Sequence, residues 1–163
     1  MELTTNPVQV GTLTASGPSL ADVRARVLAE HARLRALIAE VDRLASAVAA
    51  GESYRTEALR ERADRLYRML TEHIDHEDAV VAPIIARIDA WGSVRLEQMQ
   101  HDHAGQRMLL KQAAHDLGIE GRHLGQVVQS MCWEILHDMK REEHDLLHPD
   151  LWSDNPIVVE IGA

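Results

Sequence analysis

The chain reads His73-Ile74-Asp75-His76-Glu77 in the middle of a segment with helical periodicity. Apolar residues recur every three or four positions on both sides of this stretch. His73 and Glu77 lie on the same helix face as these apolar residues. The stripe comprises Leu59, Ala63, Leu66, Leu70, His73, Glu77, Val80 or Val81, Ile84 and Ile88. Burying an ionised carboxylate without a partner costs many kcal/mol, so buried acids are normally paired or bound to a metal. The pattern therefore predicts a metal site inside a helix bundle.

Composition limits the class of protein. At 163 residues the chain is expected to form one domain with a sizeable core. A net charge of −9 argues against partners that are nucleic acids or anionic membrane surfaces. No apolar run approaches the roughly 20 residues of a membrane span, and the first residues do not resemble a secretory signal. A single cysteine, Cys132, excludes an internal disulfide and suits a reducing cytoplasm, where we expect the protein to act.

Capping and turn residues divide the chain into four long helices. Ser19 is a good N-cap and Gly51 a good stop for the first helix, and Pro83 is expected to kink the end of the second. The predicted helices span about 20–50, 53–88, 93–117 and 121–147. Short turns between them predict an all-α, antiparallel four-helix bundle at 19–150, with an extended or flexible arm at 1–18 and a tail at 151–163. The arm and the tail are natural contacts for a homodimer, and the sequence leaves monomer and homodimer both open.

The first three helices each offer a histidine on an apolar face. His31 occupies a heptad core position between Val27 and Leu34, although a single core histidine is more often structural than a ligand. His101 and His103 point about 200° apart on a helix, so the two cannot easily face one ion. His103 shares its face with more apolar residues and is the preferred candidate, with His101 as the alternative.

The fourth helix is less regular. Glu142 follows His137 by five residues, which places the two side chains about 140° apart on an ideal helix. They would share a metal only through a π-bulge or a carboxylate that reaches across. His144 lies about two turns after His137 on the same face and suits a neighbouring site better, and Glu143 fits a solvated charged face about equally well.

These motifs together resemble the hemerythrin-like family, also called the HHE cation-binding domain. The features are a histidine on the first helix, His73-x-x-x-Glu77 followed by Pro83, a histidine early in the third helix, and His137 followed by Glu142-Glu143 and a proline. The likeness covers about residues 19–150. It implies that His31, His73, Glu77, His103 (or His101), His137 and Glu142 are ligands of a non-haem di-iron centre with an oxo or carboxylate bridge. The spacing of His137 and Glu142 departs from the HxxxE usual in bacterial members, so Glu143 and His144 stay open as alternative ligands.

Imidazoles and carboxylates without thiolate also suit iron, manganese or zinc on chemical grounds. Such a site has room for a small ligand such as dioxygen, peroxide or nitric oxide, and Tyr54 and Tyr67 are the residues that could place a phenol nearby, although ordinary packing is the commoner role of a tyrosine. The resemblance favours a catalase-like or ferroxidase-like enzyme. Reversible binding of dioxygen or nitric oxide, as carrier or sensor, is the second hypothesis, and donation of iron for stress repair is the third.

Overall fold

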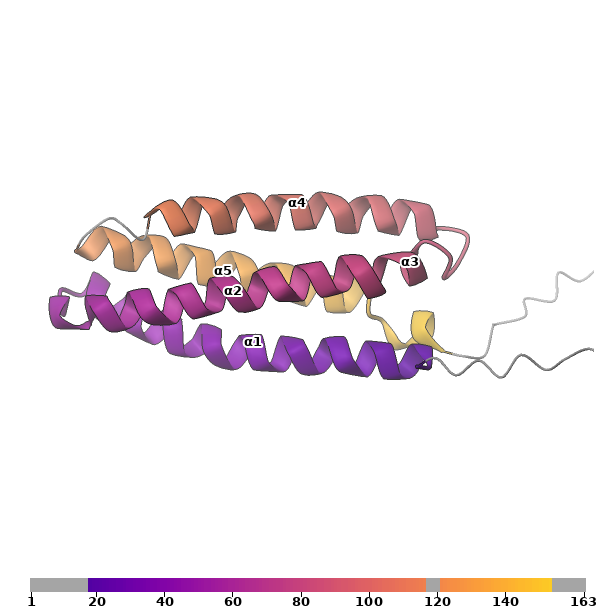
Figure 1. Cartoon of the computed structure of the whole chain (residues 1–163), viewed down its shortest axis with the longest axis horizontal. Coiled ribbons are helices and arrows are strands. Elements are labelled where there is room, and N and C mark those ends of the chain that lie inside the picture. Colours follow the sequence, from indigo (N-terminus) through magenta and orange to yellow (C-terminus); the bar gives the residue numbers. More distant parts are fainter. Residues whose placement is uncertain (1–17, 117–120, 154–163) are drawn as a thin grey trace, which may run out of the picture.

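A computed structural model describes residues 18–116 and 121–153 as an all-α antiparallel bundle (Figure 1). Four long helices form it: α1 (Leu20–Ala49), α2 (Thr56–Val80), α4 (Gly92–Asp116) and α5 (Arg122–Asp145). Three short helices accompany them: η1 (Ser53–Arg55), α3 (Ala82–Ile85) and η2 (Pro149–Trp152). The predicted fold class is confirmed. Most of the predicted arm and tail lie outside the described residues.

The predicted caps form at both ends of α1. Ser19 Oγ accepts a hydrogen bond from the backbone N–H of Asp22, and the Asp22 carboxylate accepts one from the backbone N–H of Ser19. This reciprocal pair is a capping box, which satisfies two donors that helix geometry leaves free. At the other end Gly51 takes a φ of 108°, which glycine adopts without strain, and turns the chain towards α2.

The second predicted helix ends earlier than expected. The sequence predicted one helix to Ile88, but α2 stops at Val80, and α3 continues only from Ala82 to Ile85. Pro83 supplies the reason, because proline has no backbone N–H to donate and its ring crowds the carbonyl group four residues earlier in a helix. The segment after α3 then turns back, and α4 begins at Gly92.

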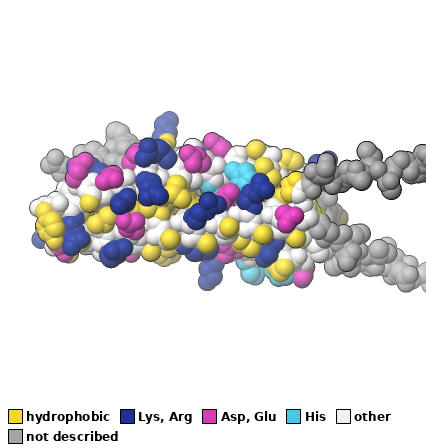
Figure 2. Space-filling model, turned by 60° about the horizontal axis from the view of Figure 1, so that its bottom comes forward, with side chains coloured by type: hydrophobic (Ala, Val, Ile, Leu, Met, Phe, Trp, Pro, Cys, Tyr) yellow, Lys and Arg dark blue, Asp and Glu magenta, His cyan; other side chains and the backbone are white. Residues whose placement is uncertain are grey.

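Helix α1 is the centre of the packing, with α2 and α5 beside it, while α4 packs on α5, α2 and α3. The contact between α1 and α5 is close at Gly125, where an added Cβ would lie 2.5 Å from the Ala45 carbonyl oxygen. Acidic and basic side chains are interspersed over the face shown in Figure 2, instead of forming one basic patch. In the described ranges, no helix combines the length and the apolar character that crossing a membrane requires.

Two apolar clusters fill the interior. One includes Leu34, Ile74, Leu110 and Met139, and the other, nearer the end with Trp152, includes Val27, Val81, Met99, Leu146 and Trp152. Along each long helix the chain passes from one cluster to the other, and a polar residue stands between them each time. These residues are His31 on α1, His73 and Glu77 on α2, His103 on α4, and Glu142 on α5. The fold thus brings five ionisable side chains to one depth.

Candidate metal centre

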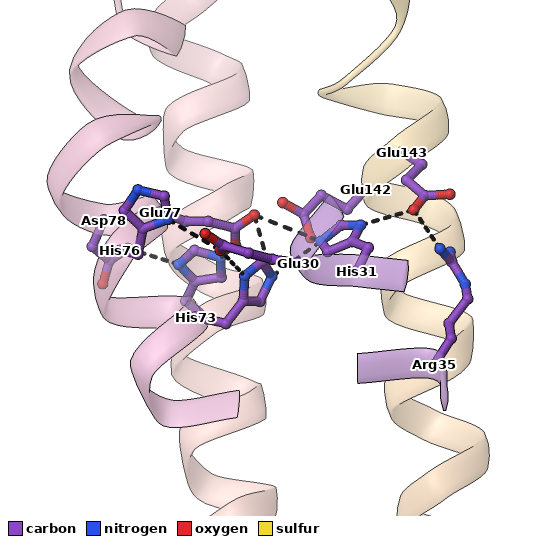
Figure 3. Close-up of polar contacts among 10 residues, drawn as sticks. Glu30, His31, Arg35, His73, His76, Glu77, Asp78, Glu142 and Glu143 are labelled. Carbon is purple, nitrogen blue, oxygen red and sulfur yellow. Dashed lines mark hydrogen bonds and ion pairs between the residues drawn. The ribbon is translucent and has the colours of Figure 1, made fainter. Parts of the chain in front are cut away.

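Four of the five polar residues form a tight cluster (Figure 3). His31, His73, Glu77 and Glu142 each offer one ligand atom, and these atoms all lie within 4.8 Å of one another. The Nε2 atoms of His31 and His73 are 3.0 Å apart. Glu77 Oε1 lies 3.4 Å from His73 Nε2 and 3.7 Å from His31 Nε2, and Glu142 Oε2 lies 3.6 Å from His31 Nε2. Separations of this size would allow one cation to contact all four groups.

His103 approaches the same cluster from the other side of Glu77. Its Nε2 lies 3.3 Å from Glu77 Oε2, whereas the histidines of α1 and α2 lie nearer Oε1. The two oxygens of one buried carboxylate therefore face different imidazoles. Carboxylates from facing helices, together with histidines, are the usual ligands of dinuclear sites inside helix bundles.

Each of the three buried histidines also contacts a carboxylate through its outer nitrogen. His31 Nδ1 lies 2.8 Å from Glu143 Oε1, and His73 Nδ1 lies 3.0 Å from Glu30 Oε2. The third pair joins His103 Nδ1 to Asp78 Oδ1 over 2.7 Å. An ionised carboxylate only accepts hydrogen bonds, so Nδ1 of each ring is the donor. Metal-binding histidines characteristically hold their other ring nitrogen in this way, which fixes the orientation of the ring.

The inner atoms of the cluster are left without adequate partners. If Nδ1 carries the hydrogen on both His31 and His73, their two Nε2 lone pairs face each other across 3.0 Å. Glu77 Oε1 and Glu142 Oε1 are buried and accept no hydrogen bond from the described residues. Leaving buried polar atoms unsatisfied is costly. A cation among these lone pairs would remove the conflict, so the residues present fit a bound metal.

The pKa values reflect the competition between burial and charge. Burial favours a higher pKa for Glu77, but its contacts with His103 and His31 outweigh it and hold that pKa well below its usual range. For Glu142, burial and the negative charge of Glu77 act together and raise the pKa well above its usual value. Burial lowers the pKa of His73, whereas burial at His103 is overcome by Glu77 and Asp78, which raise its pKa. When no metal is bound, the contacts of His103 with Glu77 and Asp78 thus favour the protonated, positively charged form of its ring.

His137 does not join the cluster. The expectation that it faces the interior is wrong, because its side chain is 57% exposed and its ring stacks on Trp133 with centroids 5.5 Å apart. Helix α5 is regularly α-helical through this region, without a π-bulge. A regular helix places residues five apart on different faces, so only one of His137 and Glu142 can point inward. The packing of Met139 and Leu146 in the core turns Glu142 inward.

The remaining candidate residues lie outside the inner cluster. His101 and His144 are exposed, and Glu143 pairs with His31 at the outer edge of the cluster. Tyr54 is 75% exposed and its hydroxyl donates to Glu52 near the start of α2. Tyr67 is partly buried against the larger apolar cluster, six residues before His73.

Sequence reasoning did not single out the outer carboxylates of Glu30 and Asp78. Each is adjacent in sequence to an inner residue, since Glu30 precedes His31 and Asp78 follows Glu77. A search for acidic residues next to the candidate ligands would have found them. Their partners, however, lie on neighbouring helices, and a helical pattern in one sequence does not specify which helices meet.

A helix bundle with buried imidazoles and carboxylates at one depth is the architecture of a metal-binding protein. The model of the Hemerythrin HHE cation binding domain family matches residues 22–149, and the chain therefore belongs to this family. The matched range runs from the first turn of α1 into η2 and includes the whole cluster. Neither a curated protein nor a solved structure matches the chain. The family and the buried cluster together indicate metal binding.

Proposed function

We propose that the chain holds a non-haem di-iron centre that reacts with hydrogen peroxide or dioxygen. The reaction we favour is catalase-like, in which two peroxide molecules give two waters and one dioxygen. Oxidation of ferrous iron by dioxygen is the related activity of the same centre. The observation that carries this proposal is Glu77, a buried carboxylate whose two oxygens face separate sets of imidazoles.

The donor groups divide unequally between two ions. His31, His73, Glu77 Oε1 and Glu142 would hold the first ion, while His103 and Glu77 Oε2 would hold the second with fewer protein ligands. An iron pair supplies two electrons by cycling between ferrous and ferric states, which is what peroxide disproportionation requires. Nitrogen and oxygen donors without thiolate suit iron in this role. With fewer protein ligands, the second ion would keep room for a small ligand.

The surroundings favour a small reactant. A cavity of about 190 Å³ lies between α1 and α2, and its lining includes His73, Glu30, His76 and Met69. This volume holds several water-sized molecules, and Glu30 and His76 in its lining can form hydrogen bonds with water or peroxide. Leu34 lines the same cavity, and Leu70 is buried about one turn before His73, so apolar side chains border the histidine layer.

Oxygen evolution tests the proposal directly. Iron-loaded wild-type protein should release dioxygen when hydrogen peroxide is added, as followed with an oxygen electrode. His73→Ala should abolish this release because it removes an inner imidazole. His123→Ala is the matched control, since this histidine is exposed on α5. The proposal would be contradicted if the iron-loaded wild type released no oxygen. A visible band that forms with dioxygen and bleaches under vacuum would then identify the protein as an oxygen carrier.

A further inference from the structure

One constellation of side chains occurs twice in the bundle. On α1, His31 and Arg35 are four residues apart, and both contact Glu143 of α5. On α4, His103 and Arg107 are also four residues apart, and both contact Asp78 of α2. In each case a carboxylate from the neighbouring helix is held between an imidazole and a guanidinium.

The distances in the two copies are nearly the same. Glu143 Oε1 lies 2.8 Å from both His31 Nδ1 and Arg35 Nη1. Asp78 uses one oxygen for each partner, with Oδ1 2.7 Å from His103 Nδ1 and Oδ2 2.8 Å from Arg107 Nη2. Figure 3 shows the first copy, with the Arg35 side chain reaching up to Glu143 beside His31.

The sequence carries the same repetition. Each outer carboxylate directly follows a buried glutamate of the cluster, Asp78 after Glu77 and Glu143 after Glu142. Adjacent residues on a helix point about 100° apart, so one acid faces the interior while the next reaches the neighbouring helix. The pairs Glu77-Asp78 and His103/Arg107 thus correspond to Glu142-Glu143 and His31/Arg35.

We propose that Arg35 and Arg107 are positioning residues that set the metal affinity of the centre. Each arginine fixes the carboxylate that orients a metal-facing imidazole, and its charge offsets that of the carboxylate near the cluster. Without the guanidinium, the carboxylate would sample other rotamers and the ring would lose its fixed direction. This inference rests on the proposed metal centre and assigns the two arginines to different halves of it, Arg35 to the half with His31 and Arg107 to the half with His103.

Ordinary structural ion pairing is the competing explanation. The side chains of Arg35 and Arg107 are 37% and 41% exposed, and ion pairs with this much solvent contribute little to folding stability. A structural role would also apply to Arg62, whose Nε lies 2.9 Å from Glu40 Oε1 and links α2 to α1. Glu40 is not among the carboxylates that contact the buried histidines. Arg62 is therefore the matched control.

The experiment is a Co²⁺ titration of the metal-free protein, followed by the visible absorption bands of bound cobalt. Arg35→Gln and Arg107→Gln should each weaken one binding step about 10-fold, the lower end of the effect typical for groups behind metal ligands. They should affect different steps and shift the cobalt bands. Arg62→Gln should bind like the wild type, and Arg35→Lys and Arg107→Lys should recover part of the affinity.

Two results would contradict the inference about the arginines without contradicting the proposed metal centre. One is wild-type Co²⁺ affinity and bands in both glutamine variants. The other is an equal loss in Arg62→Gln, which would show that any ion pair between helices has the same effect. A wild-type protein that binds no Co²⁺ would instead refute the proposed centre, and the inference with it. Melting temperatures of the metal-free variants should agree with that of Arg62→Gln, which separates lost affinity from lost folding.

Discussion

Glu142→Gln should make the metal-free protein more stable and the metal-bound protein less so. The Glu142 side chain is only 11% exposed, its Oε1 accepts no hydrogen bond from the described residues, and Oε2 lies close to the cluster. Glutamine has nearly the same shape and no charge, and its amide can donate to the Glu77 carboxylate. In the metal centre, however, a neutral amide is a much weaker ligand than a carboxylate.

The expected magnitude follows from the cost of an unsatisfied buried group, about 1–3 kcal/mol. For a domain of this size, 1 kcal/mol shifts the melting temperature by about 2–4 °C, so the metal-free variant should melt roughly 2–12 °C above the wild type. Metal at 100 times its Kd stabilises the wild type by about 2.7 kcal/mol, and the variant should lose most of this gain. Thermal melts with chelator and with excess Fe²⁺ under anaerobic conditions measure both effects.

The pH dependence of these melts has a definite sign. The pKa of Glu142 is raised above the usual 4.5 by burial and by Glu77, so the native state binds its proton more tightly than the unfolded chain does. Stability of the metal-free wild type must then fall, relative to the variant, as pH rises from about 4.5 through the native pKa. The advantage of Glu142→Gln should accordingly grow with pH and disappear in acid.

Glu134→Gln is the control, because Glu134 is exposed on the same helix. A Glu142→Gln protein that melts below this control without metal, or that metal stabilises as much as the wild type, would contradict the prediction.

Further predictions concern individual residues and the bound ions. His73→Ala should remove at least one metal ion per chain, whereas His137→Ala and His123→Ala should retain the wild-type content by elemental analysis, and equal losses in all three would contradict the ligand set. Gly125→Val should lower the free energy of unfolding by about 1–3 kcal/mol in urea titrations, since a Cβ there would lie 2.5 Å from the Ala45 carbonyl oxygen. Titration of the metal-free protein with Fe²⁺ should show two steps of unequal affinity, because the proposed centre would give two imidazoles to one ion and one to the other; a single step for both would count against this division.

The sequence was sufficient for the architecture because helix signals are local. The Ser19 N-cap and the stop at Gly51 depend on residues within a few positions, and both formed as predicted. Pro83 was correctly recognised as a disruption: α2 and α3 are separated only at Val81, which keeps αR dihedral angles, but the helix ends at Ile85, so the last residues to Ile88 were assigned wrongly.

The cluster could be predicted only where one helix decides the direction of a side chain. His31, His73, Glu77 and His103 sit on apolar faces, and helical spacing alone is enough to turn them inward. On α5 the same spacing rule places His137 and Glu142 on different helix faces, whereas the resemblance to the hemerythrin-like family implied that both are metal ligands. A regular helix resolves this conflict in favour of Glu142.

The outer contacts were beyond sequence reasoning because they join different helices. Glu30 of α1 meets His73 of α2, and Asp78 of α2 meets His103 of α4. Such pairs depend on helix rotation and on relative height along the bundle, and a single sequence states neither. The repeated arrangement around Arg35 and Arg107 became visible only with the helices in place.

Metal content per chain is the most direct test of the centre. Wild-type protein produced with iron should carry about two irons, as dinuclear carboxylate bundles do, and Glu77→Gln should lose them because the Glu77 side chain would contact both ions of the proposed centre. Protein that contains only zinc, contains no metal, or keeps its iron after Glu77→Gln would contradict a di-iron centre built on this carboxylate.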